Sequence, residues 1–362
     1  MKKNTATIWC TIFIGILLLI PASYMILKSH INTTNYENRE LAKWPTLETT
    51  NWYRFPEAID DFVSDNFPYK NQLVLMNSLA NRDVFKDNPS ANTIMGKEGF
   101  IFYTGETGNS LAQYKGTLKF SDEELKKIVD NLNTSSKYLE DRNCKFILFI
   151  APNKERMYSE YMPESIKVYD DKCSTDQVVE YLNTNTSIKT IWAYDNLKRY
   201  KESNPEKPIY YHLDTHWNNL GAYIGAKVLC DEITANIPDL DFEQTNNSSY
   251  DLANYSGLRL VLEGKDTDYE PIGLADDYEI ELDDINGSFI YHNTGKDDRR
   301  LMICRDSFTI GMRRYIGNVF NESYMPHRNE FETSMVDEFK PDVFVYEVCE
   351  RDIDKLLNFR LE

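Results

Sequence analysis

The sequence contains few of the residues that metal sites require. Its 362 residues include five histidines and six cysteines, and these form no CxxC pair, HExxH motif or other spacing typical of zinc ligands. We therefore expect neither a metal nor another cofactor. Cys173 and Cys230 can form a disulfide if that part of the chain lies outside the cytoplasm, although sequence alone does not establish the pairing.

Positive charge is also scarce. The chain has 40 lysines and arginines against 58 aspartates and glutamates, which gives a net charge of −18. A protein that binds nucleic acid needs a basic surface to neutralise phosphates, so DNA and RNA are excluded as partners. No internal repeat or low-complexity tract occurs. The 41% hydrophobic and 27% charged residues are typical of one large globular domain or two small ones.

One long uncharged run stands at the N-terminus. No charged residue occurs between Asn4 and Leu27, and a run of this length can cross a bilayer. The alternative is a cleaved signal peptide, which usually has a shorter apolar core and a small-x-small cleavage site. We expect residues 1–27 to form a cytoplasmic stub and a single membrane anchor. The two leading lysines place the N-terminus in the cytoplasm and the chain after Lys28 outside it.

The remaining chain has the pattern of a mostly parallel α/β domain. Residues 28–50 are polar and are expected to form a tether, and residues 51–362 the catalytic domain. Apolar runs such as KFILFIAP alternate with helical segments, one of which begins with a capping box formed by Ser121 and Glu124. This alternation implies parallel βαβ units in a three-layer sandwich. Residues 238–296 are acidic and rich in Asn, Asp and Gly, and are expected to be an insertion with hairpins.

Polar residues follow three of the predicted strands, and open parallel sheets place their sites at such strand ends. The run KFILFI is followed by Asn153 and Lys154. The run PIYYHL, also predicted to be a strand, leads into Asp214 and His216. The run LMIC leads into RDSF, which contains Ser307. We expect these side chains to lie at one edge of the sheet.

Asp214, His216 and Ser307 have the composition of a nucleophilic triad. Residues i and i+2 of an extended segment point to the same face, so the aspartate can orient the imidazole while its far nitrogen faces a serine. Ser307 is expected near a helix N-terminus, where backbone N–H groups can hold an oxyanion. A capping serine beside an Asx turn is a purely structural alternative. A metal site that combines His212 with Asp214, His216 and a further aspartate is another.

Eight stretches together give the chain a family resemblance. They occur in order between residues 37 and 351: ENRELAKWP, DDFVSDNFPYKNQL, MGKEGFIFY, APNKERMYSEYMP, LDTHWNNLGA, YDLANYSG, ICRDSF and VFVYEVCER. The chain resembles the alginate O-acetyltransferase (AlgX/AlgJ-like) and DHHW proteins, a branch of the SGNH hydrolase-like group. The resemblance implies a triad of Asp214, His216 and Ser307, in an order inverted from the usual SGNH arrangement. Arg305 stands where glycine usually precedes the Asp-Ser pair, which leaves the oxyanion donors other than the Ser307 N–H open.

The function that this resemblance implies is acyl transfer outside the cytoplasm. A membrane-anchored O-acetyltransferase would pass an acetyl group through Ser307 to hydroxyls of a cell-surface or secreted polysaccharide, with His216 as the base. A multi-span membrane acyltransferase is the implied source of the acetyl group. Two alternatives stay open: an acetyl esterase with the same triad, and a non-catalytic scaffold or glycan-binding component of polysaccharide export.

Several residues near the predicted site are candidates for contact with the polysaccharide. Aromatic rings can stack on sugars, amides and amines can line the crevice, and arginines can bind acidic sugars. For each of them, packing in the core or on a solvated helix face is the alternative. The candidates are Trp217, Tyr211, Tyr210, Asn153, Lys154, Arg305 and Arg313.

Overall fold

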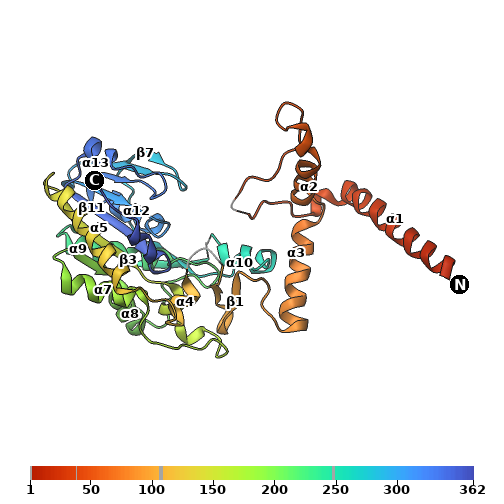
Figure 1. Cartoon of the computed structure of the whole chain (residues 1–362), viewed down its shortest axis with the longest axis horizontal. Helices are drawn as coiled ribbons and strands as arrows, with labels where there is room; N and C mark the ends of the chain where they lie inside the picture. Colours follow the sequence, from red (N-terminus) through yellow and green to blue (C-terminus); the bar gives the residue numbers. More distant parts are fainter. Residues whose placement is uncertain (1, 38, 106–108, 247–248) are drawn as a thin grey trace. The chain divides into compact units, whose positions relative to one another are not determined.

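Two units make up the chain in the computed structural model (Figure 1). The structure describes residues 2–37, 39–105, 109–246 and 249–362. Unit 1 comprises Met1–Ser90 and Ala253–Val261, and unit 2 comprises Ala91–Leu252 and Leu262–Glu362. This division differs from the predicted start of the catalytic domain at residue 51, because residues 51–90 belong to unit 1.

Unit 1 is mainly helical. The segment Thr7–His30 is long and apolar enough to cross a membrane, by length and composition, in agreement with the predicted anchor. The chain turns at Pro68, between two helices. The helices are α1 (Lys2–Leu27), η1 (Lys28–His30), η2 (Trp52–Arg54), α2 (Phe55–Asp65), α3 (Lys70–Leu79) and η3 (Ala80–Phe85).

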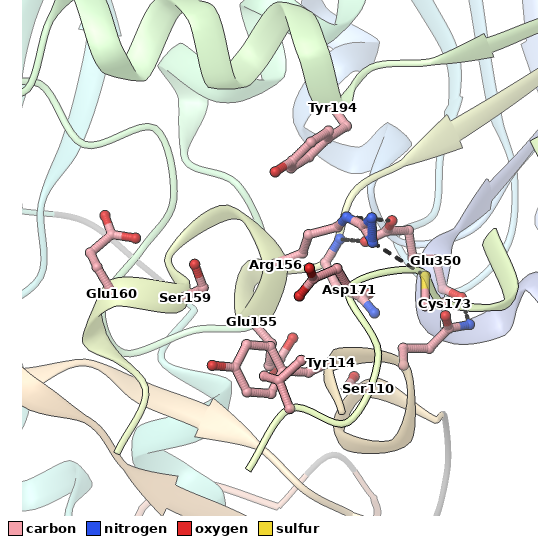
Figure 2. A pocket seen from close by; sticks show the side chains of 13 residues that line it. Ser110, Tyr114, Glu155, Arg156, Ser159, Glu160, Asp171, Cys173, Tyr194 and Glu350 are labelled. Atoms are coloured by element: carbon pink, nitrogen blue, oxygen red, sulfur yellow. Dashed lines mark hydrogen bonds and ion pairs between the residues drawn. The ribbon is translucent and has the colours of Figure 1, made fainter. Parts of the chain in front are cut away.

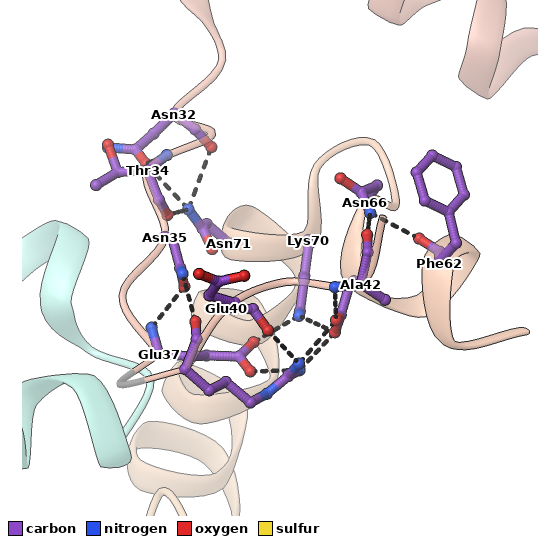
Figure 3. A network of polar contacts seen from close by, with 12 residues as sticks. Asn32, Thr34, Asn35, Glu37, Glu40, Ala42, Phe62, Asn66, Lys70 and Asn71 are labelled. Carbon is purple, nitrogen blue, oxygen red and sulfur yellow. Dashed lines mark hydrogen bonds and ion pairs between the residues drawn. The ribbon is translucent and has the colours of Figure 1, made fainter. Parts of the chain in front are cut away.

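A polar network holds part of the predicted tether against these helices (Figure 3). Arg39 makes a bidentate ion pair with Asp65 at 2.5 and 2.7 Å. The same carboxylate accepts the N–H of Ala42 at 2.8 Å, and Lys70 bridges it to Glu37. The hydrogen bonds from Arg39 hold the pKa of Asp65 well below its ordinary range. The segment from Glu37 to Ala42 is therefore fixed within unit 1.

A seven-stranded sheet forms the centre of unit 2. Its order is β4-β3-β11-β9-β10-β8-β7. The five strands from β4 to β10 are parallel, and β8 and β7 continue the sheet with antiparallel pairing. The strands are β3 (Lys145–Ala151), β4 (Lys189–Trp192), β7 (Glu279–Asp283), β8 (Phe289–His292), β9 (Asp297–Cys304), β10 (Phe320–Met325) and β11 (Val343–Cys349). The central strands β3 and β11 are apolar almost throughout because both faces of the sheet are covered.

Helices cover both faces of the sheet and complete the predicted three-layer sandwich. Alternate residues of β3 point into two separate cores, Ile147 and Phe149 into one and Leu148 and Ile150 into the other. The first core is closed by α8 (Tyr194–Ser203), α9 (Asn219–Glu232) and α12 (Thr309–Gly317). The second is closed by α5 (Asp122–Glu140), α7 (Ser174–Asn185), α13 (Ser334–Phe339) and η6 (Glu350–Leu357). The fold class is thus confirmed.

The remaining elements of the chain are short. The predicted insertion 238–296 does not form one separate piece, because β7 and β8 extend the central sheet while β5 and β6 pair as an antiparallel hairpin. The short elements are β1 (Thr93–Met95), η4 (Lys97–Gly99), β2 (Ile101–Tyr103), α4 (Ser110–Tyr114), α6 (Lys154–Met157), η5 (Ser159–Tyr161), β5 (Phe242–Thr245), α10 (Asp251–Tyr255), α11 (Arg259–Leu262) and β6 (Asp268–Pro271).

One expectation from the sequence, a strand over residues 208–213, is wrong. Residues 208–213 are not a strand, since Tyr210 makes only an isolated bridge to Trp217. Side chains replace the strand partners there: the Asp266 carboxylate accepts the N–H groups of residues 212 and 213. The possible disulfide between Cys173 and Cys230 is also absent, because all six cysteines are free and both of these thiols are buried.

Candidate active site

Three side chains form a continuous hydrogen-bonded chain beside the carboxyl ends of the parallel strands. Ser307 Oγ lies 2.7 Å from His216 Nε2, and His216 Nδ1 lies 2.8 Å from Asp214 Oδ1. Asp214 is fully buried, whereas 23% of the His216 side chain is exposed. The structure therefore brings together three predicted residues that lie up to 93 positions apart in the sequence, with the imidazole partly exposed to solvent.

Ser307 lies in the turn between β9 and α12, and Asp306 holds this turn. Its carboxylate accepts the N–H of Phe308 at 2.8 Å and that of Cys349, at the end of β11, at 2.7 Å. The Asp306 N–H donates in turn to Glu347 at 2.7 Å. Burial and the neighbouring Asp306 charge raise the pKa of Glu347 well above its ordinary value. Within the described residues the Ser307 N–H has no partner, which leaves it available to an oxyanion.

The carboxylate of Asp214 orients the imidazole. Its Oδ1 accepts the His216 N–H at 3.0 Å as well as the ring bond. Its Oδ2 accepts the hydroxyl of Ser249 and the N–H of Asp251. Burial alone would raise the pKa of Asp214, but the hydrogen bond and charge of His216 outweigh it and hold this pKa below its ordinary value. Burial lowers the pKa of His216, and Asp214 more than reverses that effect. The pair therefore stabilises a protonated imidazole, as a general base requires.

Asp251 is a second acid at the site, and sequence reasoning missed it. Its carboxylate accepts the N–H and the hydroxyl of Thr215 at 2.8 and 2.6 Å and lies 3.8 Å from His216 Nδ1. Burial, followed by the charge of Asp214, raises the pKa of Asp251 to about 6. The signal was present in the stretch YDLANYSG, but nothing in the spacing linked that stretch to the histidine.

The metal alternative fits this geometry poorly. The ligand atoms of Asp214, His216 and Asp251 lie within 4.8 Å of one another. However, Asp214 Oδ1 and His216 Nδ1 are at hydrogen-bonding distance from each other, which leaves no room for an ion bound to both atoms. His212 does not join the cluster, because its ring packs on Phe100 with centroids 4.1 Å apart.

Close packing of α9 against α12 sets the separation of the histidine and the serine. A Cβ atom added to Gly311 on α12 would lie 2.6 Å from the Cβ of Ala222 on α9, so glycine is needed there. Trp217, immediately after the histidine, donates its indole N–H to the Phe308 carbonyl at 3.0 Å. Trp217 is only 2% exposed. The structure therefore places it between the two helices and does not support its predicted contact with sugar.

Comparison with known proteins identifies the domain. A family model described as "SGNH hydrolase-like domain, acetyltransferase AlgX" matches residues 93–262, a range that includes Asp214 and His216 and ends before Ser307. Over these residues the chain matches an AlgX-type SGNH hydrolase-like domain. The relationship predicted from the eight stretches is thus confirmed.

Individual relatives of the AlgX-type domain are distant in sequence. The probable alginate O-acetylase AlgJ of Pseudomonas syringae pv. tomato is 22% identical over 260 residues, which are 71% of this chain and 60% of that protein. A DHHW family protein from Eubacterium siraeum has a TM-score of 0.50 and 15% identity, covering 74% of this chain and 98% of its own. Bacillus cereus PatB1 with a sulfonyl adduct has a TM-score of 0.52 and 13% identity, covering 74% and 99%. At these identities the structural likeness establishes the fold.

Two other predicted contacts of the AlgX-type domain are interior side chains. Tyr210 is fully buried and donates its hydroxyl to the Pro152 carbonyl at 2.6 Å. Lys154 is 2% exposed and donates to the carbonyls of His212 and Asp214 at 2.9 and 2.8 Å. Burial lowers the pKa of Lys154 to about 8. Both side chains support the loop that carries the aspartate and the histidine, and the structure does not support a sugar contact for either.

The two predicted arginines are also engaged within the protein. Arg305 is fully buried and donates to the carbonyls of residues 284, 285 and 287, while its guanidinium lies 4.2 Å from the centroid of the Phe289 ring. Arg313 is half-buried, donates to the Tyr291 hydroxyl at 3.1 Å and pairs with Asp283 at 3.5 Å. Neither guanidinium is directed at the triad, so the predicted contacts are not supported.

Tyr211 and Asn153, two further predicted contacts, lie near the proposed site. Tyr211 is half-buried, and its N–H donates to the His216 carbonyl at 3.2 Å. Asn153 follows β3, and its Oδ1 accepts the N–H of Arg351 at 3.1 Å. The Arg351 guanidinium lies 5.3 Å from the centroid of the Phe308 ring, next to the serine. Arg351 belongs to VFVYEVCER, the last of the eight stretches that carry the family resemblance.

Proposed function

We propose that this protein is a membrane-anchored O-acetyltransferase that acts outside the cytoplasm on a polysaccharide. The observation that carries the proposal is the hydrogen-bonded chain from Ser307 through His216 to Asp214, with distances of 2.7 and 2.8 Å. The family of the domain supports the acetyl group as the cargo. The name of the relative AlgJ, a probable alginate O-acetylase, supports a polysaccharide as the acceptor.

The proposed reaction has two steps. His216 Nε2 takes the proton of Ser307 Oγ, which attacks the carbonyl carbon of an acetyl ester or thioester. The Ser307 N–H holds the oxyanion, and the imidazolium, stabilised by Asp214, gives its proton to the leaving group. In the second step His216 deprotonates a sugar hydroxyl, and the hydroxyl oxygen attacks acetyl-Ser307 and releases the serine. If water replaces the sugar, the same steps give an esterase.

The proposed setting follows from the N-terminal helix. One apolar helix fits a membrane anchor, and we propose that the N-terminus lies in the cytoplasm and the AlgX-type domain outside it. A donor that reaches this domain has to cross the membrane or be carried across it. A multi-span membrane acyltransferase is therefore the proposed partner that supplies the acetyl group.

Trapping the acyl-enzyme tests this proposal. The full chain in detergent micelles is mixed with p-nitrophenyl acetate, quenched within the burst phase and digested for peptide mass spectrometry. We expect acetyl on Ser307, and its loss in Ser307→Ala and His216→Ala. The matched control is Ser203→Ala, which removes an exposed hydroxyl on α8. A burst without acetyl-Ser307, or turnover unchanged in both site variants, would contradict the triad and favour the non-catalytic alternative.

A second probe tests the nucleophile without turnover. PatB1 has been determined with a sulfonyl adduct, and sulfonyl fluorides react with activated serines. We expect phenylmethylsulfonyl fluoride to label Ser307, and p-nitrophenyl acetate to slow that labelling by occupying the same oxygen. Adding a hydroxylated sugar acceptor then distinguishes a transferase from an esterase. A transferase places acetyl on the sugar, whereas an esterase releases only acetate.

A further inference from the structure

A polar cavity of about 430 Å³ lies beside the proposed active site (Figure 2). Asn153, which follows β3, and Glu350, which follows β11, both line it, so it lies at the carboxyl ends of these two strands. None of the three triad side chains lines this cavity. Its volume falls in the range of roughly 300–1,000 Å³ that is typical of sites for small ligands.

Buried polar atoms without hydrogen-bond partners line this cavity. Ser110 Oγ, Gln113 Oε1 and Asn153 Nδ2 make no hydrogen bond within the described residues, and Glu350 Oε1 has only an ion pair with Arg156 Nε at 3.8 Å. All four side chains are at most 4% exposed. A buried polar atom without a partner costs about 1–3 kcal/mol, so these atoms require a ligand or water. They include both donors and acceptors, which is the combination that hydroxyl groups satisfy.

The rest of the lining suits a sugar. The rings of Tyr114 and Tyr194 contribute apolar surface to a wall that is otherwise polar. Sugars present hydroxyl groups at their edges and C–H groups on their faces, so they need both kinds of surface. Water alone satisfies the polar atoms but gains nothing from the two rings.

The charge of the cavity selects among sugars. Its single basic side chain, Arg156, is ion-paired with Asp176 at 2.8 Å and lies 3.8 Å from Glu350, and its buried Nε makes no hydrogen bond within the described residues. Two nearby cations are directed elsewhere, since Lys154 donates to backbone carbonyls and Arg351 lies over Phe308. The carboxyl groups that line the cavity are those of Glu155, Glu160, Asp171 and Glu350. Glu160 and Asp171 are exposed acids, so a uronic acid would place its carboxylate beside like charges, whereas a neutral or amino sugar would not.

The cavity is close enough to the serine to serve the same polymer. The strand order β3-β11-β9 places the end of β3 two strands from the end of β9, where Ser307 begins the turn into α12. Adjacent strands are about 4.8 Å apart, so these ends are separated by about 10 Å. A sugar chain bound in the cavity can therefore extend to the serine.

We propose that this cavity is an acceptor subsite for an uncharged or amino-substituted sugar, and that it excludes uronic acids. The proposal rests on the proposed function for the statement that the bound sugar belongs to the acceptor. The binding itself depends on neither Ser307 nor an acetyl donor. The predicted acceptor thus differs in charge from alginate, the substrate in the name of the relative AlgJ.

Three tetrasaccharides with one β-1,4 backbone test the proposal. Cellotetraose is neutral, the chitosan tetramer carries amines, and tetraglucuronate carries carboxylates. Binding to the full chain is measured by calorimetry and saturation-transfer NMR in a detergent without a sugar headgroup. We expect cellotetraose or the chitosan tetramer to bind at least tenfold more tightly than tetraglucuronate. Tetraglucuronate binding as tightly as the others, or no binding by any tetramer, would overturn the proposal and leave a water-filled cavity.

Two substitutions locate the binding. Ser110→Trp fills the cavity and is expected to abolish binding. Ser110→Ala keeps the volume, loses one hydroxyl and is expected to weaken binding about five- to tenfold, so it remains informative if the larger side chain prevents folding. Thermal unfolding of both variants reports whether they fold. Binding unaffected by either substitution in a folded protein would place the sugar elsewhere and overturn the assignment.

The binding result separates this proposal from the proposed function. Sugar binding in a chain that never forms acetyl-Ser307 would retain the cavity and refute the acetyltransferase. Formation of acetyl-Ser307 in a chain that binds none of the tetramers would retain the acetyltransferase and refute the sugar-binding cavity.

Discussion

Replacing Asp214 with asparagine removes one charge from the site and tests the role of the acid. The Asp214 carboxylate accepts the His216 Nδ1–H at 2.8 Å, which leaves Nε2 unprotonated and facing Ser307. An asparagine amide in the same place can donate to Nδ1. The ring proton then moves to Nε2, where it blocks transfer of the proton from Ser307.

The expected loss is large because the wrong tautomer cannot act as a base. Losing the acid of a serine triad lowers the rate about 10⁴-fold, which corresponds to about 5.5 kcal/mol of transition-state stabilisation. Asp251 reduces this loss only in part. Its carboxylate is 3.8 Å from Nδ1 and is held by Thr215, so it attracts the imidazolium without orienting the ring.

The pH dependence separates the two acids. The reaction requires neutral His216, whose pKa Asp214 raises above its usual 6.5 against the effect of burial. In Asp214→Asn the effect of burial on the pKa of His216 is no longer offset by the Asp214 carboxylate. The pH midpoint of acylation is therefore expected to fall below 6.5. Asp251 becomes ionised more easily once the charge of Asp214 is gone, because that charge contributes to raising its pKa to about 6. The double variant with Asp251→Asn is therefore expected to have a lower midpoint than the single one.

The assay is the burst of p-nitrophenol from p-nitrophenyl acetate between pH 5 and 9. Asp130→Asn, which removes an exposed carboxylate on α5, is the matched control and should behave as wild type. Activity of Asp214→Asn within tenfold of wild type would refute the orienting role. An unchanged midpoint in both site variants would refute the assignment of His216 as the titrating base.

Three further predictions concern packing, burial and capping. Gly311→Ala drives a Cβ against Ala222 and separates α12 from α9, so acylation should fall about 10²-fold; a burst like that of wild type would contradict this account. Burial raises the pKa of Glu350 from 4.5 to about 7, so the native protein holds this proton over a range in which the unfolded chain has lost it. The free energy of unfolding should therefore fall by up to about 3 kcal/mol between pH 4.5 and 7, and urea titrations should find that Glu350→Gln lacks this decrease. Ser121→Ala breaks the capping box with Glu124 on α5 and should cost about 1 kcal/mol in urea unfolding while leaving acylation unchanged.

Local sequence patterns determined the elements whose stability is local or whose environment is uniform. The apolar runs of β3 and β11 identified central strands because a strand covered on both faces needs apolar residues throughout. The capping box at Ser121 and Glu124 marked the start of α5 because its bonds join neighbours in the chain. The N-terminal run identified α1 in the same way. Asp214, His216 and Ser307 could be chosen because short motifs contain them.

Tertiary structure alone decided what surrounds these residues. Residues 208–213 have a strand-like composition, yet Asp266, more than fifty residues later, accepts the N–H groups of residues 212 and 213, and no ladder forms. Trp217 was expected at a sugar and is instead packed between two helices, and Asp251 was missed because its partner Thr215 is 36 residues away. A periodic pattern of apolar residues in the sequence indicates which face of a helix or strand is buried. Which distant groups meet depends on the order of the strands and the paths between them, and these contacts form the site and the cavity beside it.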